Sequence, residues 1–288
     1  MRRDPRQFGI ESTRWTLDRI QAVCDWLRTT TRGGLCRLLD RLDLSWKSGR
    51  QHVHSPDPDY LAKMADIAVH VQRGRTEISR TLTLYLDELT FYRQPTLAKA
   101  YEEKGHSIQP LAELGYRTNT ATRIVAALNV YDGRLTYLRA SKLTVDRLIA
   151  FYQQLCDTYE DADRIDVVMD NWPIHFHPDV LAALVPQESP WPRYLPSHWS
   201  KEPSQKALKR WGGLRLPIQA IPLPTYASWL NPTEKLWRKL KQDVLHLHRF
   251  ADRLDELREE VDRFLRQFAD GSHDLLQYVG LAKTVLIC

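Results

Sequence analysis

The stretch Pro222–Lys241, PLPTYASWLNPTEKLWRKLK, is the most informative part of the chain. Asn231 and Pro232 are typical of a helix start, because Asn caps helices and Pro fits their first turn. The apolar residues that follow recur at the spacing of one helix face, and they are Leu236, Trp237 and Leu240. Glu234 therefore falls in the first turn of a predicted helix. There an acid either favours the helix dipole or serves as a metal ligand, and the local pattern alone favours the dipole.

Two upstream segments carry acids near the ends of predicted strands. Thr81–Leu89, TLTLYLDEL, is a β-branched and apolar run that reaches Asp87 and Glu88. In Ile165–His175, IDVVMDNWPIH, a short apolar run leads into Asp170. Because ligands of open α/β sheets gather at the carboxyl ends of strands, we expect both segments to contribute to one site. Each Asp taken alone is equally well explained as a cap or turn residue.

Asp87, Asp170 and Glu234 would together supply three hard oxygen ligands. Such a set suits Mg²⁺ or Mn²⁺, which bind carboxylates and water, and not Zn²⁺, which favours His and Cys. Glu88 ranks below Asp87 as a ligand, because successive side chains of a strand point to opposite faces of the sheet. The sequence therefore predicts a divalent-metal site made of acids that lie far apart along the chain.

Three blocks carry a resemblance to a known family: YLDE at 85–88, MDNWPIH at 169–175 and LPTYASWLNPTEKLWRKLK at 223–241. They resemble the DDE transposases in the bacterial insertion-sequence branch of the mariner superfamily, the IS six-thirty family. That family typically shows Leu-Pro-x-Tyr-Ser-Pro-x-Leu-Asn-Pro-Ile-Glu-x-x-Trp. The third block matches it except that Ala227-Ser228-Trp229 replaces Ser-Pro-x and Thr233 replaces Ile. The third block is specific, whereas the first two are weak alone.

The resemblance implies an α/β fold with an RNase H-like catalytic core, which is a mixed five-stranded sheet with helices on both faces. It also implies a metal-dependent DNA transposase in which Asp87 and Asp170 share two Mg²⁺ or Mn²⁺ ions and Glu234 holds one of them. Water cuts a DNA strand, and the resulting 3′-hydroxyl attacks target DNA, usually at TA dinucleotides. The expected partners are double-stranded DNA (terminal inverted repeats and target) and a second copy of the chain as a homodimer.

Periodicity predicts the elements of this core. Strands are expected at Thr81–Leu86, Arg123–Val130, Leu135–Arg139, Val167–Met169 and Ile218–Leu223, with Asp132-Gly133 in the hairpin turn between the second and third. Helices are expected at Thr144–Tyr159, Pro178–Val185, Asn231–His246 and Leu254–Phe268.

The stretch 185–217 is rich in Pro, Trp and Lys and reads as an insertion between the fourth and fifth strands. It lengthens the gap between Asp170 and Glu234 beyond that of relatives, so whether Glu234 returns to the two Asp residues is open. Its Trp and basic residues are suited to gripping unpaired DNA. Packing as a lid or as a dimer contact explains them slightly better.

Composition excludes several classes of protein. The chain has 288 residues, which is enough for one large domain and a small one, and 43% of them are hydrophobic. No run is long enough for a membrane span, and the Arg-rich N-terminus is not a secretory signal. The four Cys have no metal-site spacing and indicate free thiols in a reducing compartment. We expect a cytoplasmic, nucleoid-associated bacterial protein, and no nucleotide cofactor because no phosphate-binding Gly loop occurs.

The net charge of +5 is concentrated near the N-terminus. Residues 1–80 contain 15 Lys and Arg against 10 Asp and Glu, whereas the remainder contains 26 of each. Within 1–55, Thr16–Leu27 and Arg32–Leu42 are two amphipathic helices joined by a short turn. This pattern fits a helix-turn-helix or a generic helical hairpin, and the resemblance favours DNA binding. The predicted DNA contacts here are Arg32, Arg37, Arg41, Lys47 and Arg50.

The remaining domains follow: a linker with a connecting helix at 56–80, and the catalytic domain at 81–288. In the catalytic domain the basic residues after Glu234 are predicted to contact DNA, although a solvated helix face is the commoner explanation of such a patch; they are Lys235, Arg238, Lys239 and Lys241. Substrate contact is predicted for Asn171, His175 and Asn231.

Two alternative functions stay open on this scaffold. One is a DNA-binding protein that has lost or repurposed its chemistry. The other is a nuclease of the RNase H superfamily that cuts DNA without strand transfer.

Overall fold

The computed structural model describes residues 3–28, 31–45, 54–74, 80–102, 109–193 and 195–282. The chain divides into two compact units, Met1–Val53 and His54–Cys288. Two of the predicted DNA contacts, Lys47 and Arg50, lie outside the described residues. Three cysteines, Cys24, Cys36 and Cys156, carry free thiols.

The N-terminal unit contains the short helix η1 (Pro5–Phe8) and the helices α1 (Leu17–Val23) and α2 (Arg32–Arg41). Threonine side chains cap both α-helices: Thr16 accepts the amide of Arg19 at 3.4 Å, and Thr31 accepts the amide of Gly34 at 3.1 Å. Such caps satisfy amides that the first helical turn leaves unpaired. Helix α1 ends four residues before the predicted Leu27, whereas α2 matches its predicted range within one residue.

The second unit is built on one mixed sheet with the strand order β3-β2-β1-β4-β5. The strands are β1 (Thr81–Tyr92), β2 (Ala121–Asn129), β3 (Leu135–Ala140), β4 (Arg164–Met169) and β5 (Ile218–Pro222). Strands β1, β2 and β3 pair antiparallel, while β4 is parallel to both β1 and β5. Gly133, at φ 73°, supplies the left-handed turn residue of the β2–β3 hairpin, as predicted. The predicted RNase H-like sheet is confirmed.

The predicted end of the first strand is wrong. The sequence suggested an end at Leu86, but β1 continues to Tyr92 because β2 pairs with it along this whole length. Leu89 and Phe91 are buried in this extension, so the alternation of apolar residues continues past the two acids. Asp87 therefore lies inside a long strand, at the level where its parallel neighbour β4 ends.

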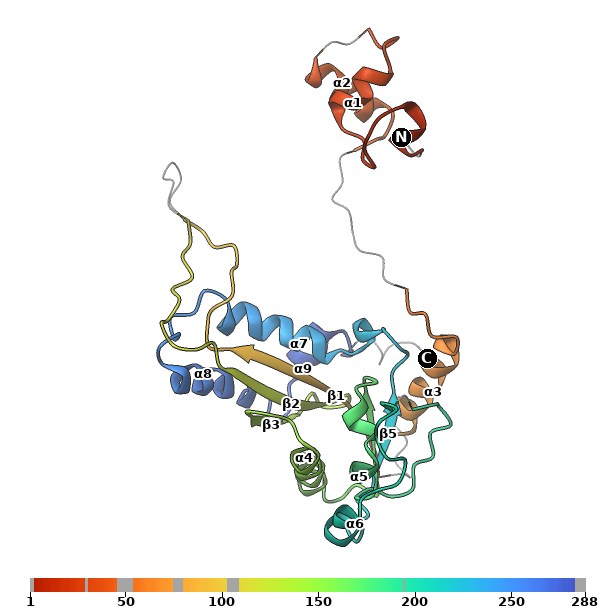
Figure 1. The fold of residues 1–288 in the computed structure, drawn as a ribbon, viewed down its shortest axis with the longest axis vertical. Coiled ribbons are helices and arrows are strands. Elements are labelled where there is room, and N and C mark those ends of the chain that lie inside the picture. The colour runs from red at the N-terminus through yellow and green to blue at the C-terminus, as the bar shows by residue number, and fades with distance from the viewer. Residues whose placement is uncertain are drawn as a thin grey trace. The chain divides into compact units, whose positions relative to one another are not determined.

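Helices cover both faces of the sheet (Figure 1). One face packs against α4 (Val145–Thr158) and α5 (Pro178–Leu181), and its core includes Leu84 and Leu86 of β1. The other face packs against α7 (Thr233–Leu240), α8 (Leu254–Arg266) and α9 (His273–Val279), and its core includes Leu89 and Phe91. Beyond α7 the chain makes one π-helical turn, Lys241–Leu245.

Helix α3 (Tyr60–Arg73) belongs to the second unit. Its inward residue Ile67 packs with Tyr85 of β1 and Ile221 of β5 in a third, smaller core. A buried ion pair joins Lys63 of this helix to Asp57, at 2.7 Å. The predicted connecting helix is therefore packed against the sheet.

The segment 185–217 returns to the sheet instead of disrupting it. Leu184 and Leu216 form a parallel bridge at its two ends, so β5 enters the sheet in register with β4. Between them lies α6 (Gln205–Trp211), which Ser204 caps. The segment also contacts α3, because the indole of Trp191 donates a hydrogen bond to Asp66 at 2.8 Å.

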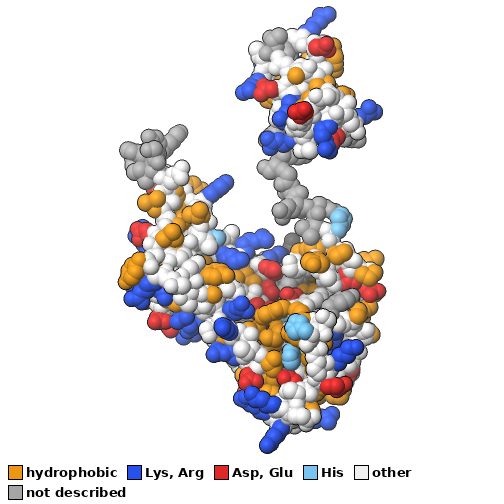
Figure 2. Space-filling model, in the orientation of Figure 1, with side chains coloured by type: hydrophobic (Ala, Val, Ile, Leu, Met, Phe, Trp, Pro, Cys, Tyr) orange, Lys and Arg blue, Asp and Glu red, His pale blue; other side chains and the backbone are white. Residues whose placement is uncertain are grey.

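An arm of irregular chain connects β1 to β2. Its described residues expose large hydrophobic side chains, visible in orange on Figure 2, and they are Leu97, Tyr101, Leu111, Leu114 and Tyr116. Among the described helices, none has the length and apolar character needed to cross a membrane.

Candidate active site

The strand register brings the two predicted Asp residues together. Strands β1 and β4 run parallel, with Tyr85 paired to Val168. Two residues further along each strand are Asp87 and Asp170. Because parallel strands keep a constant register, these two acids lie at the same level of the sheet, where the β1–β4 pairing ends.

The start of α7 is fastened to β1 directly beside Asp87. The side-chain amide of Asn231 donates to the carbonyl oxygen of Leu86 at 2.8 Å, and its oxygen accepts the amide of Thr233 at 3.1 Å. The hydroxyl of Thr233 donates to the carbonyl oxygen of Tyr85 at 3.3 Å. These bonds hold the first turn of α7, with Glu234, against the strand that carries Asp87.

Helix α7 also contacts Asp87 itself. The indole N–H of Trp237 donates a hydrogen bond to Oδ2 of Asp87 at 3.0 Å. Trp237 follows Glu234 by three residues, so the two side chains lie about one turn apart. The Asp87 side chain therefore points to the α7 face of the sheet.

The pKa of Asp87 reflects its burial and the acids around it. Burial, the charge of Glu234 and the charges of Glu88 and Asp170 together raise the pKa of Asp87 to about 8. Glu234 is exposed, whereas Asp87 and Asp170 are partly buried. The inserted segment thus does not keep Glu234 away from the two Asp residues. Their role as ligands remains a prediction.

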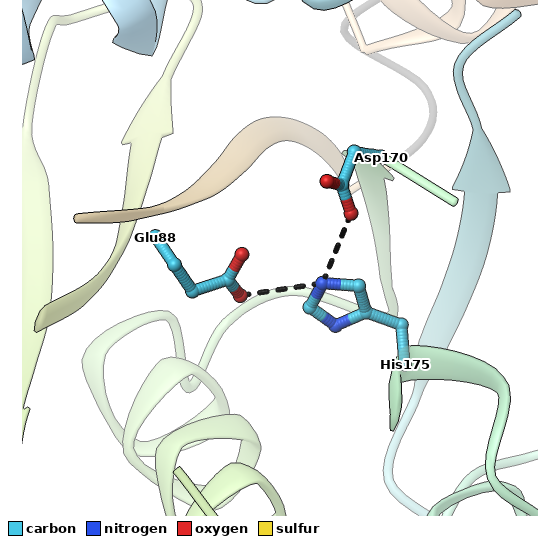
Figure 3. Close-up of side chains that lie close together, drawn as sticks. All are labelled: Glu88, Asp170 and His175. Carbon is cyan, nitrogen blue, oxygen red and sulfur yellow. Dashed lines mark ion pairs between the residues drawn. The ribbon is translucent and has the colours of Figure 1, made fainter. Parts of the chain in front are cut away.

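A second cluster joins His175 to Glu88 and Asp170. The sequence did not predict that these three side chains lie together. Nε2 of His175 lies 3.2 Å from Oε1 of Glu88 and 3.5 Å from Oδ1 of Asp170 (Figure 3). Glu88 points away from Asp87, as strand alternation predicts, and reaches His175 on the opposite face. In the sequence, the adjacency of Asp87 and Glu88 indicates that Glu88 points to the opposite face of the sheet. Only the fold shows that His175 lies beside it there.

In this cluster the two acids favour the charged form of His175, and His175 favours the charged form of Asp170. Burial opposes protonation of His175, but Glu88 and Asp170 outweigh it and raise its pKa to about 9. Burial likewise opposes ionisation of Asp170, but His175 and the backbone amide of Trp172 outweigh it and lower its pKa. The angles at His175 are too poor for regular hydrogen bonds, and its two ring nitrogens and Glu88 Oε1 have no such partner among the described residues. We therefore regard both contacts as ion pairs.

Two of the predicted substrate contacts have little exposed surface in this structure: His175 is fully buried and Asn231 is 2% exposed. Their contact with substrate stays a prediction. Asn231 secures α7, and His175 lies behind Asp170. Asn171 is partly buried, and its amide donates to the carbonyl oxygen of Leu223 at 2.7 Å.

Among the described residues, one set of three donors lies close enough together to hold a cation, and the predicted ligands form a second set of suitable chemistry. Glu88, Asp170 and His175 offer ligand atoms within 4.8 Å of one another. Asp87, Asp170 and Glu234 offer only carboxylate oxygens, the ligand type that Mg²⁺ and Mn²⁺ prefer. Asp170 is common to both sets.

The basic residues predicted on α7 differ in their surroundings. Lys235 donates to the carbonyl oxygen of Val279, and Lys239 pairs with Asp243, each at 2.7 Å. Arg238 and Lys241 are exposed, and their side chains have no hydrogen bond or ion pair to any described residue. In the N-terminal unit Arg32 pairs with Asp18 at 2.8 Å, while Arg37 and Arg41 are exposed.

The chain is similar in sequence to one known protein family. The sequence model of the family described as "DDE superfamily endonuclease" matches residues 82–258, a range that contains all three acids and most of the sheet. The chain belongs to this family. The predicted resemblance is thereby confirmed. Membership of this family supports a function as a nuclease or transposase.

One curated relative of this chain is the "Insertion element IS630 uncharacterized 39 kDa protein" of Shigella sonnei. It is 20% identical over 280 residues, which are 96% of this chain and 71% of that protein. Two solved structures are similar in fold and 16% identical, and each comparison covers 96% of this chain and 78% of the other. They are "Mos1 transposase paired-end complex with left transposon end", with a TM-score of 0.53, and "Crystal structure of the Mos1 mariner paired end complex with Mn", with a TM-score of 0.51.

Proposed function

We propose that this chain is a DNA transposase. It binds the ends of its element, hydrolyses DNA strands there and joins the 3′-hydroxyl to target DNA. The observation that supports the proposal is the strand register that puts Asp87 and Asp170 at one level of the sheet, together with the hydrogen bonds that hold the first turn of α7, with Glu234, against β1. The relative from an insertion element and the fold of the mariner complexes support it.

The acids fit a divalent cation. Carboxylates that converge in a partly buried site repel one another, and a bound cation would remove that repulsion. We propose that Asp87, Asp170 and Glu234 hold two Mg²⁺ or Mn²⁺ ions. Such ions lower the pKa of water and stabilise charge on the attacking and leaving oxygens of phosphoryl transfer.

The protein's own residues prepare this site in three ways. Trp237 holds the carboxylate of Asp87, and the amide of Trp172 holds that of Asp170 at 2.8 Å. His175 forms an ion pair with Asp170 and, against the effect of burial, lowers its pKa. Glu234 is exposed at the first turn of α7 and can adjust to the substrate.

The surface beside Glu234 suits a DNA backbone. Arg238 and Lys241 follow Glu234 at i+4 and i+7, so the three residues share one helix face. Two exposed cations in line with the acid would contact phosphates and bring the strand to the site. We propose that Arg32, Arg37, Arg41, Lys47 and Arg50 bind the terminal repeats. We further propose that the protein acts as a cytoplasmic, nucleoid-associated homodimer and inserts at TA sites.

A supercoiled plasmid that carries the element's terminal repeats, incubated with the protein and Mg²⁺, tests the proposal. Strand-transfer products support a transposase. Cuts without joining indicate a nuclease, and binding without cuts indicates a DNA-binding protein that has lost the chemistry.

The matched variants are Asp170→Asn and Asp161→Asn, since Asp161 is an exposed acid at the turn between α4 and β4. Asp170→Asn should abolish cutting but keep binding to the element ends, whereas Asp161→Asn should cut normally. Normal cutting by Asp170→Asn would overturn the assignment of the site.

A further inference from the structure

A loop connects β5 to α7 (Figure 1), and both of its ends are bonded to neighbours of the acids. At one end, the carbonyl oxygen of Leu223 accepts a hydrogen bond from Asn171, the neighbour of Asp170. At the other end, Asn231 bonds the carbonyl oxygen of Leu86, the neighbour of Asp87. Both ends of this loop are therefore anchored to residues next to the acids.

Two aromatic side chains project from it. Tyr226 is 78% exposed and Trp229 is 45% exposed, while Leu223 and Ala227 of the same loop are 2% exposed. The loop is thus well packed, yet it leaves its two largest side chains in water. Two aromatic rings are thus available on this loop for contact with another molecule.

The backbone at Tyr226 is strained. Its φ of 54° is in the left-handed region, which bulky residues rarely adopt. Such strain persists only where the surroundings enforce it, and it is concentrated at binding and catalytic sites. The chain thus holds Tyr226 outward at a conformational cost.

The preceding residue shows how the strain is maintained. The carbonyl oxygen of Thr225 accepts a hydrogen bond from the hydroxyl of Ser55 at 2.6 Å, and its amide donates to Oδ2 of Asp57 at 2.7 Å. Asp57 in turn forms the buried ion pair with Lys63. Both polar groups of the Thr225 backbone are therefore held by side chains that are distant in sequence.

We propose that Tyr226 and Trp229 stack on an unpaired nucleobase of the DNA strand whose phosphate lies at the acids. This inference rests on the proposed function. A duplex hides the faces of its bases, so these rings find a partner only at a frayed or cut end. An aromatic ring stacks on any of the four bases, so the contact selects an unpaired structure and not a sequence.

Binding of two DNA probes tests the inference. One is a short blunt duplex, and the other is the same duplex with an unpaired overhang on one strand. Fluorescence anisotropy in EDTA measures both affinities without cutting. The wild type should prefer the overhang, and Tyr226→Ala should lose about tenfold in that preference, the size of one stacking contact. Tyr226→Phe, which keeps the ring, should retain the preference.

The control is Tyr92→Ala, because Tyr92 is a 49% exposed tyrosine at the end of β1 outside this loop. It should bind both probes like the wild type. A 2-aminopurine placed in the overhang gives a second readout, since stacking quenches its fluorescence. The quenching should be weaker with Tyr226→Ala and Trp229→Ala.

Several outcomes would overturn the inference. Equal affinity of the wild type for both probes would refute it while leaving the proposed transposase intact. Two further outcomes would also refute the inference and leave the proposed transposase intact. One is that Tyr226→Ala changes only the oligomeric state, which would make the rings a protein contact. The other is that Tyr226→Phe loses the preference for the overhang, as Tyr226→Ala does. Failure of the wild type to bind or cut any DNA would remove the inference together with the proposed function.

Discussion

The indole N–H of Trp237 donates to Oδ2 of Asp87 at 3.0 Å, linking the helix of Glu234 to the strand of Asp87. Trp237→Phe would keep most of the buried ring and remove the donor. We expect the Mg²⁺ concentration for half-maximal cleavage to rise about 10- to 100-fold, as for other residues that orient metal ligands. Titration of cleavage with Mg²⁺ measures this. Trp211→Phe, on α6, should leave the titration unchanged, and equal effects of the two variants would contradict the proposed role of Trp237.

Asp87→Asn should stabilise the protein while abolishing cleavage. Because its pKa is raised to about 8, Asp87 takes up a proton on folding near neutral pH, which costs stability. Asn removes this cost and leaves a side-chain oxygen to accept the Trp237 hydrogen bond. We expect the free energy of unfolding in EDTA to rise by about 0.5–2 kcal/mol, the usual range for relief of this kind. Added Mg²⁺ should stabilise the wild type more than the variant, because only the wild type has the full set of ligands. A variant that is less stable in EDTA and gains as much from Mg²⁺ would contradict this.

His175→Gln should weaken cleavage through Asp170, because the imidazole is fully buried and forms an ion pair with that acid. We expect cleavage to fall about 10- to 100-fold at limiting Mg²⁺, since Asp170 loses its neighbour. The variant should also be less stable, because Glu88 loses its counter-charge. Adding Glu88→Gln should restore part of that stability in a double-mutant cycle. His198→Gln, at an exposed histidine, is the control.

The sequence selected three candidate acids but did not predict their surroundings. Asp87, Asp170 and Glu234 could be selected because each ends or begins a recognisable pattern of strand or helix. The position of His175 could not, because its contact with Glu88 depends on how the short helix Pro173–Phe176 folds back towards β1. A histidine after a strand end looks the same in sequence whether it faces substrate or core.

The errors in the elements have similar causes. Strand β1 was predicted to end at Leu86 because charged residues usually end strands, yet its pairing with β2 carries it through both acids. Helix α9 was missed because His273–Val279 is only seven residues long, and α7, with which it packs, is distant in sequence. Tertiary packing decides both cases, whereas the hairpin at Gly133 is local and was predicted correctly.

Acid should weaken the attachment of α3 through Asp57. Burial opposes ionisation of Asp57, but Lys63 and the amides of Thr225 and Asp59 outweigh it and lower its pKa to about 2. A carboxyl whose pKa is lowered by folding adds stability above its unfolded value of 3.8, and this is lost as the pH falls towards about 2. Asp57→Asn should therefore flatten the dependence of unfolding free energy on pH in that window, measured by urea titration.

At neutral pH the same variant leaves Lys63 buried without a counter-charge, which should cost about 3–5 kcal/mol. The exposed pair of Arg80 and Asp163, at 3.1 Å, provides the control. Asp163→Asn should change stability by less than about 1 kcal/mol. Equal effects of the two variants would show that burial does not determine the strength of the Asp57 pair.

Arg238 and Lys241 should contribute to DNA affinity through phosphate contacts alone. Each exposed cation that meets a phosphate releases a bound counterion, so its removal should lower the slope of log affinity against log salt by about 0.9. Arg238→Ala and Lys241→Ala should each show this change, and the double variant about twice as much, with no change in sequence preference. Lys209→Ala, at an exposed lysine of α6, should keep the wild-type slope. If Lys209→Ala lowers the slope as much as Arg238→Ala, the protein binds DNA through general surface charge, and the α7 face has no special role in bringing the strand to Glu234.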